Sequence, residues 1–153
     1  MTGKEQLLEK LRAEKQATQA ANGVDWDTQR QEWIASINEL LTQLKGWMAT
    51  AVGEGLLSVE DTSHDMTEEH LGTYIAPGLR ISTPAGRKVD VRPHARVIIG
   101  GLGRVDLVSG PSRSMLIRDE SGDWKLAARG GPGLKTAPLT EETFSETLTW
   151  ILN

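Results

Sequence analysis

Residues 79–127 read LRISTPAGRKVDVRPHARVIIGGLGRVDLVSGPSRSMLIRDESGDWKLA, and the pattern of this stretch decides the fold. Short runs rich in β-branched residues alternate with turn residues, which is typical of strands. The gaps between the runs are so short that neighbouring strands are expected to pair antiparallel. The sequence therefore predicts an antiparallel meander with strands at residues 79–83, 88–92, 96–100, 104–108, 113–118 and 123–127.

Alternation along these strands divides their side chains between two faces of the sheet. The apolar set is expected to face the core and consists of Leu79, Ile81, Val89, Val91, Val97, Ile99, Val105, Leu107, Met115, Ile117, Trp124 and Leu126. Two aspartates, Asp90 and Asp106, fall on the opposite face together with Lys125. The same face is expected to carry the candidate binding residues, which are Arg80, Lys88, Arg92, Arg96, Arg104 and Arg118.

Two helices are expected before the sheet and one after it. Thr2 and Glu5 have the spacing of a capping box, and the first helix would end at Asn22-Gly23. The second would begin at Asp25 or Asp27 and end at Gly53. Its broad stripe of tryptophan and aliphatic residues suits a helix that lies on a sheet, so the stripe is interpreted as core. The last helix would begin at Thr140.

The segment 54–76 is acidic and contains no lysine or arginine. It is expected to be a connector with a short strand at residues 56–60 and one helical turn capped by Thr67. Residues 130–133 are expected to form a flexible exit from the sheet.

These elements predict one α+β domain over residues 1–153. Helices at the N-terminus and a C-terminal helix would pack on one face of an antiparallel β-meander of about five or six strands. Its parts are a helical region (1–53), the acidic connector (54–76), the sheet (77–129) and the C-terminal helix (140–152).

Composition narrows the classes of function. The chain has 153 residues, of which 38% are hydrophobic and 25% charged, as in a packed globular protein. It has no cysteine, which excludes disulfides, thiolate-ligated metals and a cysteine nucleophile. No apolar run resembles a signal peptide or a membrane span, so we expect a cytoplasmic location and no membrane partner.

Charge is distributed unevenly along the chain. Residues 77–138 contain 11 basic and 5 acidic residues, whereas residues 1–76 contain 6 basic and 13 acidic ones. Clustered arginines bind phosphates and carboxylates well. On an open antiparallel sheet, however, they often serve only to pair with aspartates on neighbouring strands, and this interpretation remains open.

No motif predicts a catalytic residue, a metal site or a cofactor. His64 and His70 are six residues apart, which fits no common metal-binding spacing. The glycine-rich stretch 99–104 is followed by a strand pattern rather than a helix, which favours a turn over a phosphate loop. The serines near the sheet lack the flanking glycines of a nucleophile elbow.

Three hypotheses about function remain. The leading one is a non-catalytic interaction module that binds an acidic protein through the arginine-rich face. The second is a protein that binds nucleic acid or a phosphorylated ligand through Arg80, Arg92, Arg96 and Arg104. Nucleic acid is the less favoured partner, because the predicted strands offer no exposed aromatic residue for base stacking. The third is a small hydrolase that uses His94 or His70 with a neighbouring carboxylate.

Overall fold

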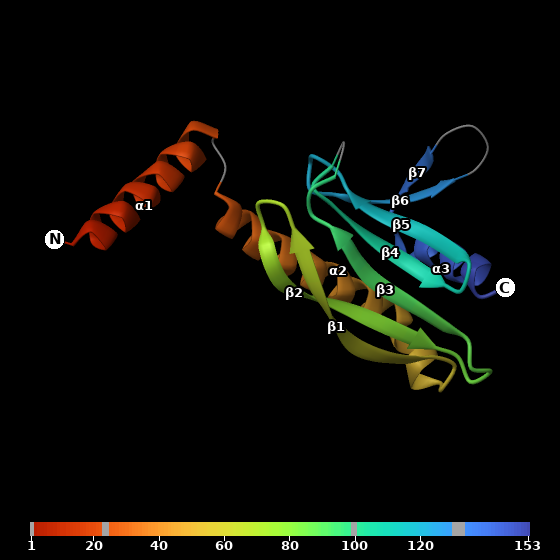
Figure 1. Cartoon of the computed structure of the whole chain (residues 1–153). Coiled ribbons are helices and arrows are strands. Elements are labelled where there is room, and N and C mark those ends of the chain that lie inside the picture. Colours follow the sequence, from red (N-terminus) through yellow and green to blue (C-terminus); the bar gives the residue numbers. More distant parts are fainter. Residues whose placement is uncertain (1, 23–24, 99–100, 130–133) are drawn as a thin grey trace.

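A computed structural model describes residues 2–22, 25–98, 101–129 and 134–153. Within these ranges the chain forms three helices and one antiparallel sheet of seven strands (Figure 1). The helices are α1 (Gly3–Asn22), α2 (Trp26–Gly53) and α3 (Glu141–Ile151). The strands are β1 (Ser58–Glu68), β2 (Gly72–Ser82), β3 (Lys88–Ala95), β4 (Gly103–Ser109), β5 (Ser112–Arg118), β6 (Trp124–Arg129) and β7 (Leu134–Pro138).

The sheet is a meander in which the strands lie in sequence order, so that each pairs with the strand that follows it. The predicted α+β class and the antiparallel arrangement are confirmed. The described residues contain seven strands instead of the expected five or six. The two additional strands, β1 and β7, form the two edges of the sheet.

The acidic segment differs most from the expectation. Residues 54–76, predicted to be a connector, contain all of β1 and the first part of β2, and these strands pair over their whole length. Thr67 caps no helical turn, because it lies in β1 with its hydroxyl 3.1 Å from that of Thr73. Acidic side chains on an edge strand oppose pairing with another chain, which gives this segment a structural reason for its charge.

The predicted strand at residues 96–100 is wrong where the structure describes it. β3 continues to Ala95, and its register with β4 shifts between Pro93 and Ala95. Beyond this irregularity Arg96 and Val97 lie outside the sheet, and Ile98 makes only an isolated bridge to Gly101. Residues 99–100, and the exit predicted at 130–133, lie outside the described ranges.

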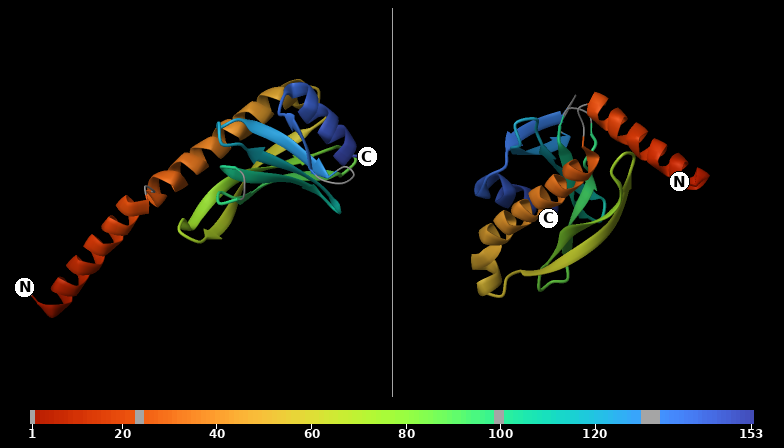
Figure 2. Two further views of the ribbon diagram at one scale, coloured as in Figure 1. Left: turned by 90° about the horizontal axis from the view of Figure 1, so that it is seen from above. Right: turned by 90° about the vertical axis from the view of Figure 1, so that its left-hand side faces the viewer.

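Helices α2 and α3 cover one face of the sheet (Figure 2). The two helices meet at Trp47 and Phe144, whose ring centroids are 5.8 Å apart. Apolar side chains from both helices, from strands β2 to β6 and from the β1–β2 turn form a single core: Trp33, Ile37, Leu40, Leu41, Leu44, Met48, Leu71, Tyr74, Ala76, Leu79, Ile81, Val89, Val91, Val105, Leu107, Leu116, Leu126, Phe144, Leu148 and Ile151.

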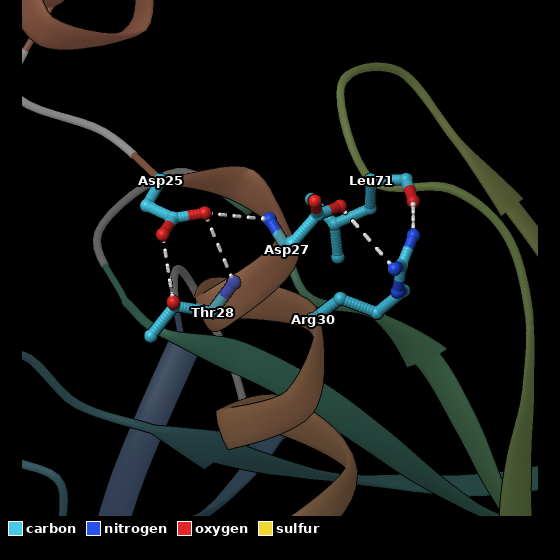
Figure 3. A network of polar contacts seen from close by, with 5 residues as sticks. All are labelled: Asp25, Asp27, Thr28, Arg30 and Leu71. Carbon is cyan, nitrogen blue, oxygen red and sulfur yellow. Dashed lines mark hydrogen bonds and ion pairs between the residues drawn. The ribbon is translucent and has the colours of Figure 1, made fainter. Parts of the chain in front are cut away.

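The start of α2 is tied to the β1–β2 hairpin (Figure 3). Asp25 caps the helix by accepting hydrogen bonds from the backbone amides of Asp27 and Thr28 and from the Thr28 hydroxyl. The bonds from Thr28 and Asp27 lower the pKa of Asp25. Arg30 then donates to the carbonyl oxygen of Leu71 at 3.0 Å and contacts Asp27. These contacts fix one end of α2 beside the hairpin turn.

Helix α1 does not join the packed layers. The capping box between Thr2 and Glu5 is present, with both backbone amides hydrogen-bonded. The helix nevertheless projects away from the sheet (Figures 1 and 2), and Leu7, Leu8 and Leu11 are 55%, 38% and 50% exposed. The expectation of N-terminal helices on one face of the sheet therefore holds for α2 and not for α1.

Candidate partner-docking face

The face of the sheet opposite α2 and α3, called the open face below, carries the charged side chains. On β2, β3 and β4 the residues that alternate with the buried aliphatic ones belong to this face. The register places Arg80 opposite Asp90 and Arg92 opposite Asp106. Charged groups from three consecutive strands are thus brought together.

Asp90 is shared by two arginines. Its carboxylate accepts a hydrogen bond from Arg80 Nε at 2.9 Å and one from Arg92 Nη2 at 3.0 Å, and its side chain is only 18% exposed. Burial raises the pKa of Asp90, but the hydrogen bonds and charges of the two arginines outweigh it and hold the pKa below its ordinary value. Asp90 is therefore ionised at neutral pH and orients both guanidinium groups.

Asp106 organises a second cluster. Its side chain is 4% exposed and accepts two hydrogen bonds from Arg104, at 2.7 and 3.1 Å from Nε and Nη2. Arg113 Nη1 and His94 Nδ1 each lie 3.6 Å from Oδ2 of the same carboxylate. This two-point contact with Arg104 is the geometry in which a guanidinium binds a carboxylate most strongly.

The two clusters leave an excess of positive charge. Four arginines surround two aspartates, and Lys88 adds a further exposed cation at the start of β3. Glu60 on β1 is the one additional acid whose charge acts on Arg80. Arg92 and Arg113 are about half exposed, so part of each guanidinium remains accessible to a partner.

The structure divides the six predicted site residues into two groups. Arg80, Lys88, Arg92 and Arg104 lie on the open face as predicted. Arg96 and Arg118 do not: Arg96 donates to Gln29 on α2, and Arg118 Nη1 lies 3.6 Å from Glu32 on the same helix. The predicted orientation of these two residues is wrong, because the β-bulge ends regular alternation before Arg96 and because β5 has the opposite orientation.

On β5 the buried residues are Ser114 and Leu116, so the side chains of Arg113, Met115 and Ile117 belong to the open face. The prediction had placed Met115 and Ile117 in the core. Arg113 and His94 were not among the predicted site residues. A period-two alternation counted from Leu116 rather than from Met115 would have identified Arg113.

Two histidines bear on the hydrolase hypothesis. His94 lies beside Asp106, whereas His70 is in the β1–β2 turn, 3.8 Å from Glu69 and stacked on Trp26. A cleft of about 530 Å³ beside α2 and one of about 780 Å³ beside α3 are both described, and neither histidine lines either of them.

Comparison of the chain with known protein families, curated proteins and solved structures found no match. Across the described ranges, no group of three or more histidine and acidic side chains is arranged to hold a metal ion. None of the helices in those ranges is long and apolar enough to cross a membrane.

Proposed function

We propose that the protein is a non-catalytic interaction module that binds an acidic protein partner through the open face. The observation that carries this proposal is the excess of arginines over aspartates on a face that α2 and α3 leave uncovered. Asp90 and Asp106 hold the guanidinium groups in place. The arginine side chains therefore lose little further conformational entropy when a partner binds them.

The apolar residues next to the arginines support the same proposal. Met115 pairs with Asp106 and Ile117 with Arg104 across β4 and β5, and both side chains are only partly buried. An apolar area flanked by arginine resembles the composition of protein interfaces, in which arginine and methionine are enriched.

A protein partner fits the open face better than nucleic acid. Among the described residues, the aromatic side chains either belong to the core or pack against it, except Trp150 on α3. The open face therefore offers no aromatic surface on which bases stack.

The test compares recovery of partners by the tagged wild-type chain and by Arg92→Glu/Arg113→Glu from an extract of the native cells. Both substitutions reverse half-exposed charges on the open face. We expect the wild type to retain one acidic protein that the double variant loses, and we expect high salt to weaken the complex. Lys135→Glu on edge strand β7 is the matched charge-reversal control and should retain the partner.

Unchanged recovery by the double variant would refute the proposal. Circular dichroism shows whether the double variant is folded. Nucleic acid in the eluate, released by high salt and lost in the double variant, would favour the second hypothesis instead.

A further inference from the structure

A cleft on the opposite side of the molecule from the open face has the features of a small-ligand site. It has a volume of about 530 Å³ and lies between α2 and the end of the β5–β6 hairpin. Its lining includes Ser36, Glu39, Gln43, Arg118 and Trp124. Its volume is within the range of roughly 300–1,000 Å³ that is usual for small-molecule sites.

Arg118 provides a cation at one end of this cleft. Its side chain is 16% exposed, and its polar contacts are long: Nε donates to the Gly122 carbonyl at 3.4 Å, and Nη1 lies 3.6 Å from Glu32. A guanidinium has five N–H donors, so most of those on Arg118 remain available to a ligand.

A second arginine, Arg96, lies near Arg118. Burial lowers the pKa of Arg96, Glu32 opposes that effect, and the charge of Arg118 lowers the pKa further. Arg96 and Arg118 are therefore close enough to repel each other, with Glu32 beside both. Arg96 Nη2 donates to neutral Gln29, and Glu68 on β1 also acts on Arg96, so Glu32 is the carboxylate on α2 that lies beside Arg118.

Glu39 provides an anion farther along the cleft. It lies seven residues after Glu32 on α2, and seven residues at a rise of 1.5 Å span about 10 Å along a helix. Glu39 is exposed and has no ion pair among the described residues. The cleft is thus cationic where Arg118 lies and acidic about two helical turns away.

The remaining lining suits an uncharged chain between these ends. Trp124 packs against Trp33 with ring centroids 6.0 Å apart and contributes an apolar wall. Gln43 supplies an amide that both donates and accepts hydrogen bonds. Ser36 already donates its hydroxyl to the Glu32 carbonyl at 2.8 Å, so it contributes mainly a small, shape-defining side chain.

We propose that this cleft binds a small zwitterion about the length of a tripeptide, with its carboxylate on Arg118, its ammonium group near Glu39 and its middle against Trp124. An extended tripeptide spans roughly 10 Å, which matches the separation along α2. A ligand with only one charged end would contact either Arg118 or Glu39 but not both.

The first test uses trialanine as the probe and follows the amide resonances of the ¹⁵N-labelled full chain. We expect shifts around Arg118, Glu39 and Trp124, with a dissociation constant of about 1 mM. N-acetyl-trialanine and trialanine amide, each lacking one terminal charge, should bind about tenfold more weakly. The proposal would be refuted if the capped peptides bound as tightly as trialanine, or if about 10 mM trialanine shifted no resonance in the cleft.

The second test assigns each charge to its residue. Arg118→Gln should weaken the binding of trialanine about tenfold and leave the binding of trialanine amide, which has no carboxylate, unchanged. Glu39→Gln should likewise weaken the binding of trialanine about tenfold and leave the binding of N-acetyl-trialanine, which has no ammonium group, unchanged. Glu54→Gln, at the end of α2 and outside the cleft, is the matched control. If Arg118→Gln fails to fold, the binding of the capped peptides and the Glu39→Gln variant, at an exposed residue, still test the proposal.

This inference is independent of the proposed docking function. Arg92→Glu/Arg113→Glu changes the open face alone, so it should leave trialanine binding intact, and Arg118→Gln should leave recovery of an acidic partner intact. Loss of both activities in either variant would mean that the two sites are not separate.

Discussion

His64 on β1 is held in a close arrangement on the open face. Its Nε2 lies 2.9 Å from the Thr62 hydroxyl, and a Cβ on Gly78 of the neighbouring strand would be only 2.6 Å from the same nitrogen. Burial lowers the pKa of His64, the positive charge of Arg92 lowers it further, and Asp90 acts in the opposite direction. The imidazole is therefore harder to protonate in the folded protein than in the unfolded chain.

This difference predicts a loss of stability in mild acid. Below the ordinary histidine pKa of 6.5, the unfolded chain binds a proton that folded His64 takes up only at lower pH, so the free energy of unfolding falls as the pH decreases. Urea melts at pH 7 and pH 5.5 should show a smaller decrease for His64→Gln than for the wild type. An undiminished decrease in His64→Gln would contradict the prediction.

Gly103 is required by its close approach to Trp33. A Cβ at this position would lie 2.2 Å from Cζ3 of the tryptophan, and the glycine has a φ of +152°. Trp33 is fully buried and cannot move aside without disturbing Trp124. We expect Gly103→Ala to lower the free energy of unfolding by about 1–3 kcal/mol, measured by urea denaturation.

Gly53→Ala is a suitable comparison, because a Cβ at Gly53 would meet no atom within 4 Å. It should leave stability unchanged or slightly raised. Equal stability of the two alanine variants would show that Trp33 tolerates the added methyl group.

Among the elements, α3 depends on a well-formed N-terminus. Thr140 accepts a hydrogen bond from the Thr143 amide, and Thr143 accepts one from the Thr140 amide, which completes a capping box. Thr140→Ala removes one of these bonds and should cost about 1 kcal/mol of stability in a thermal or urea melt. Thr149→Ala, on the exposed side of the same helix, should cost less, and the reverse order would exclude capping as the cause.

β5 shows why the faces of the sheet were only partly predictable. In Met115-Leu116-Ile117 three apolar residues are consecutive, so period-two alternation alone cannot decide which of them face the core. The structure buries Leu116 together with Ser114, a polar residue that gives no sign of burial in the sequence. Because β5 has this orientation, Arg113 lies on the open face and Arg118 faces α2 instead.

The acidic hairpin was predicted only in part, as a short strand at residues 56–60, and for a different reason. β1 has few apolar residues, because an edge strand packs on one side only and its charges discourage further pairing. Its pairing partner β2 begins seven residues earlier than the alternating pattern indicates. By contrast, α2 was predicted from one end to the other, since its cap, its apolar stripe and its terminal glycine all agree.

At the scale of the whole molecule, α1 is an arm outside the packed body. Its leucines are exposed, and none of the side chains described in α1, those of residues 3–15, belongs to the core. Removing residues 1–24 should therefore leave the melting temperature of the remaining chain within about 1 °C, since surface changes alter stability little. Calorimetry of the full and the shortened chain would check this, and a lower melting temperature after removal would show that α1 stabilises the body.

The strict succession of β1 to β7 has a consequence for assembly of the protein. Every strand after β1 finds its first partner already synthesised immediately before it, so the sheet can grow one hairpin at a time as the chain leaves the ribosome. Such local pairing costs little loop entropy and favours rapid folding. Since α2 is complete before β1 emerges, each new strand adds to a sheet whose covering helix is already present, while α3 closes the core last.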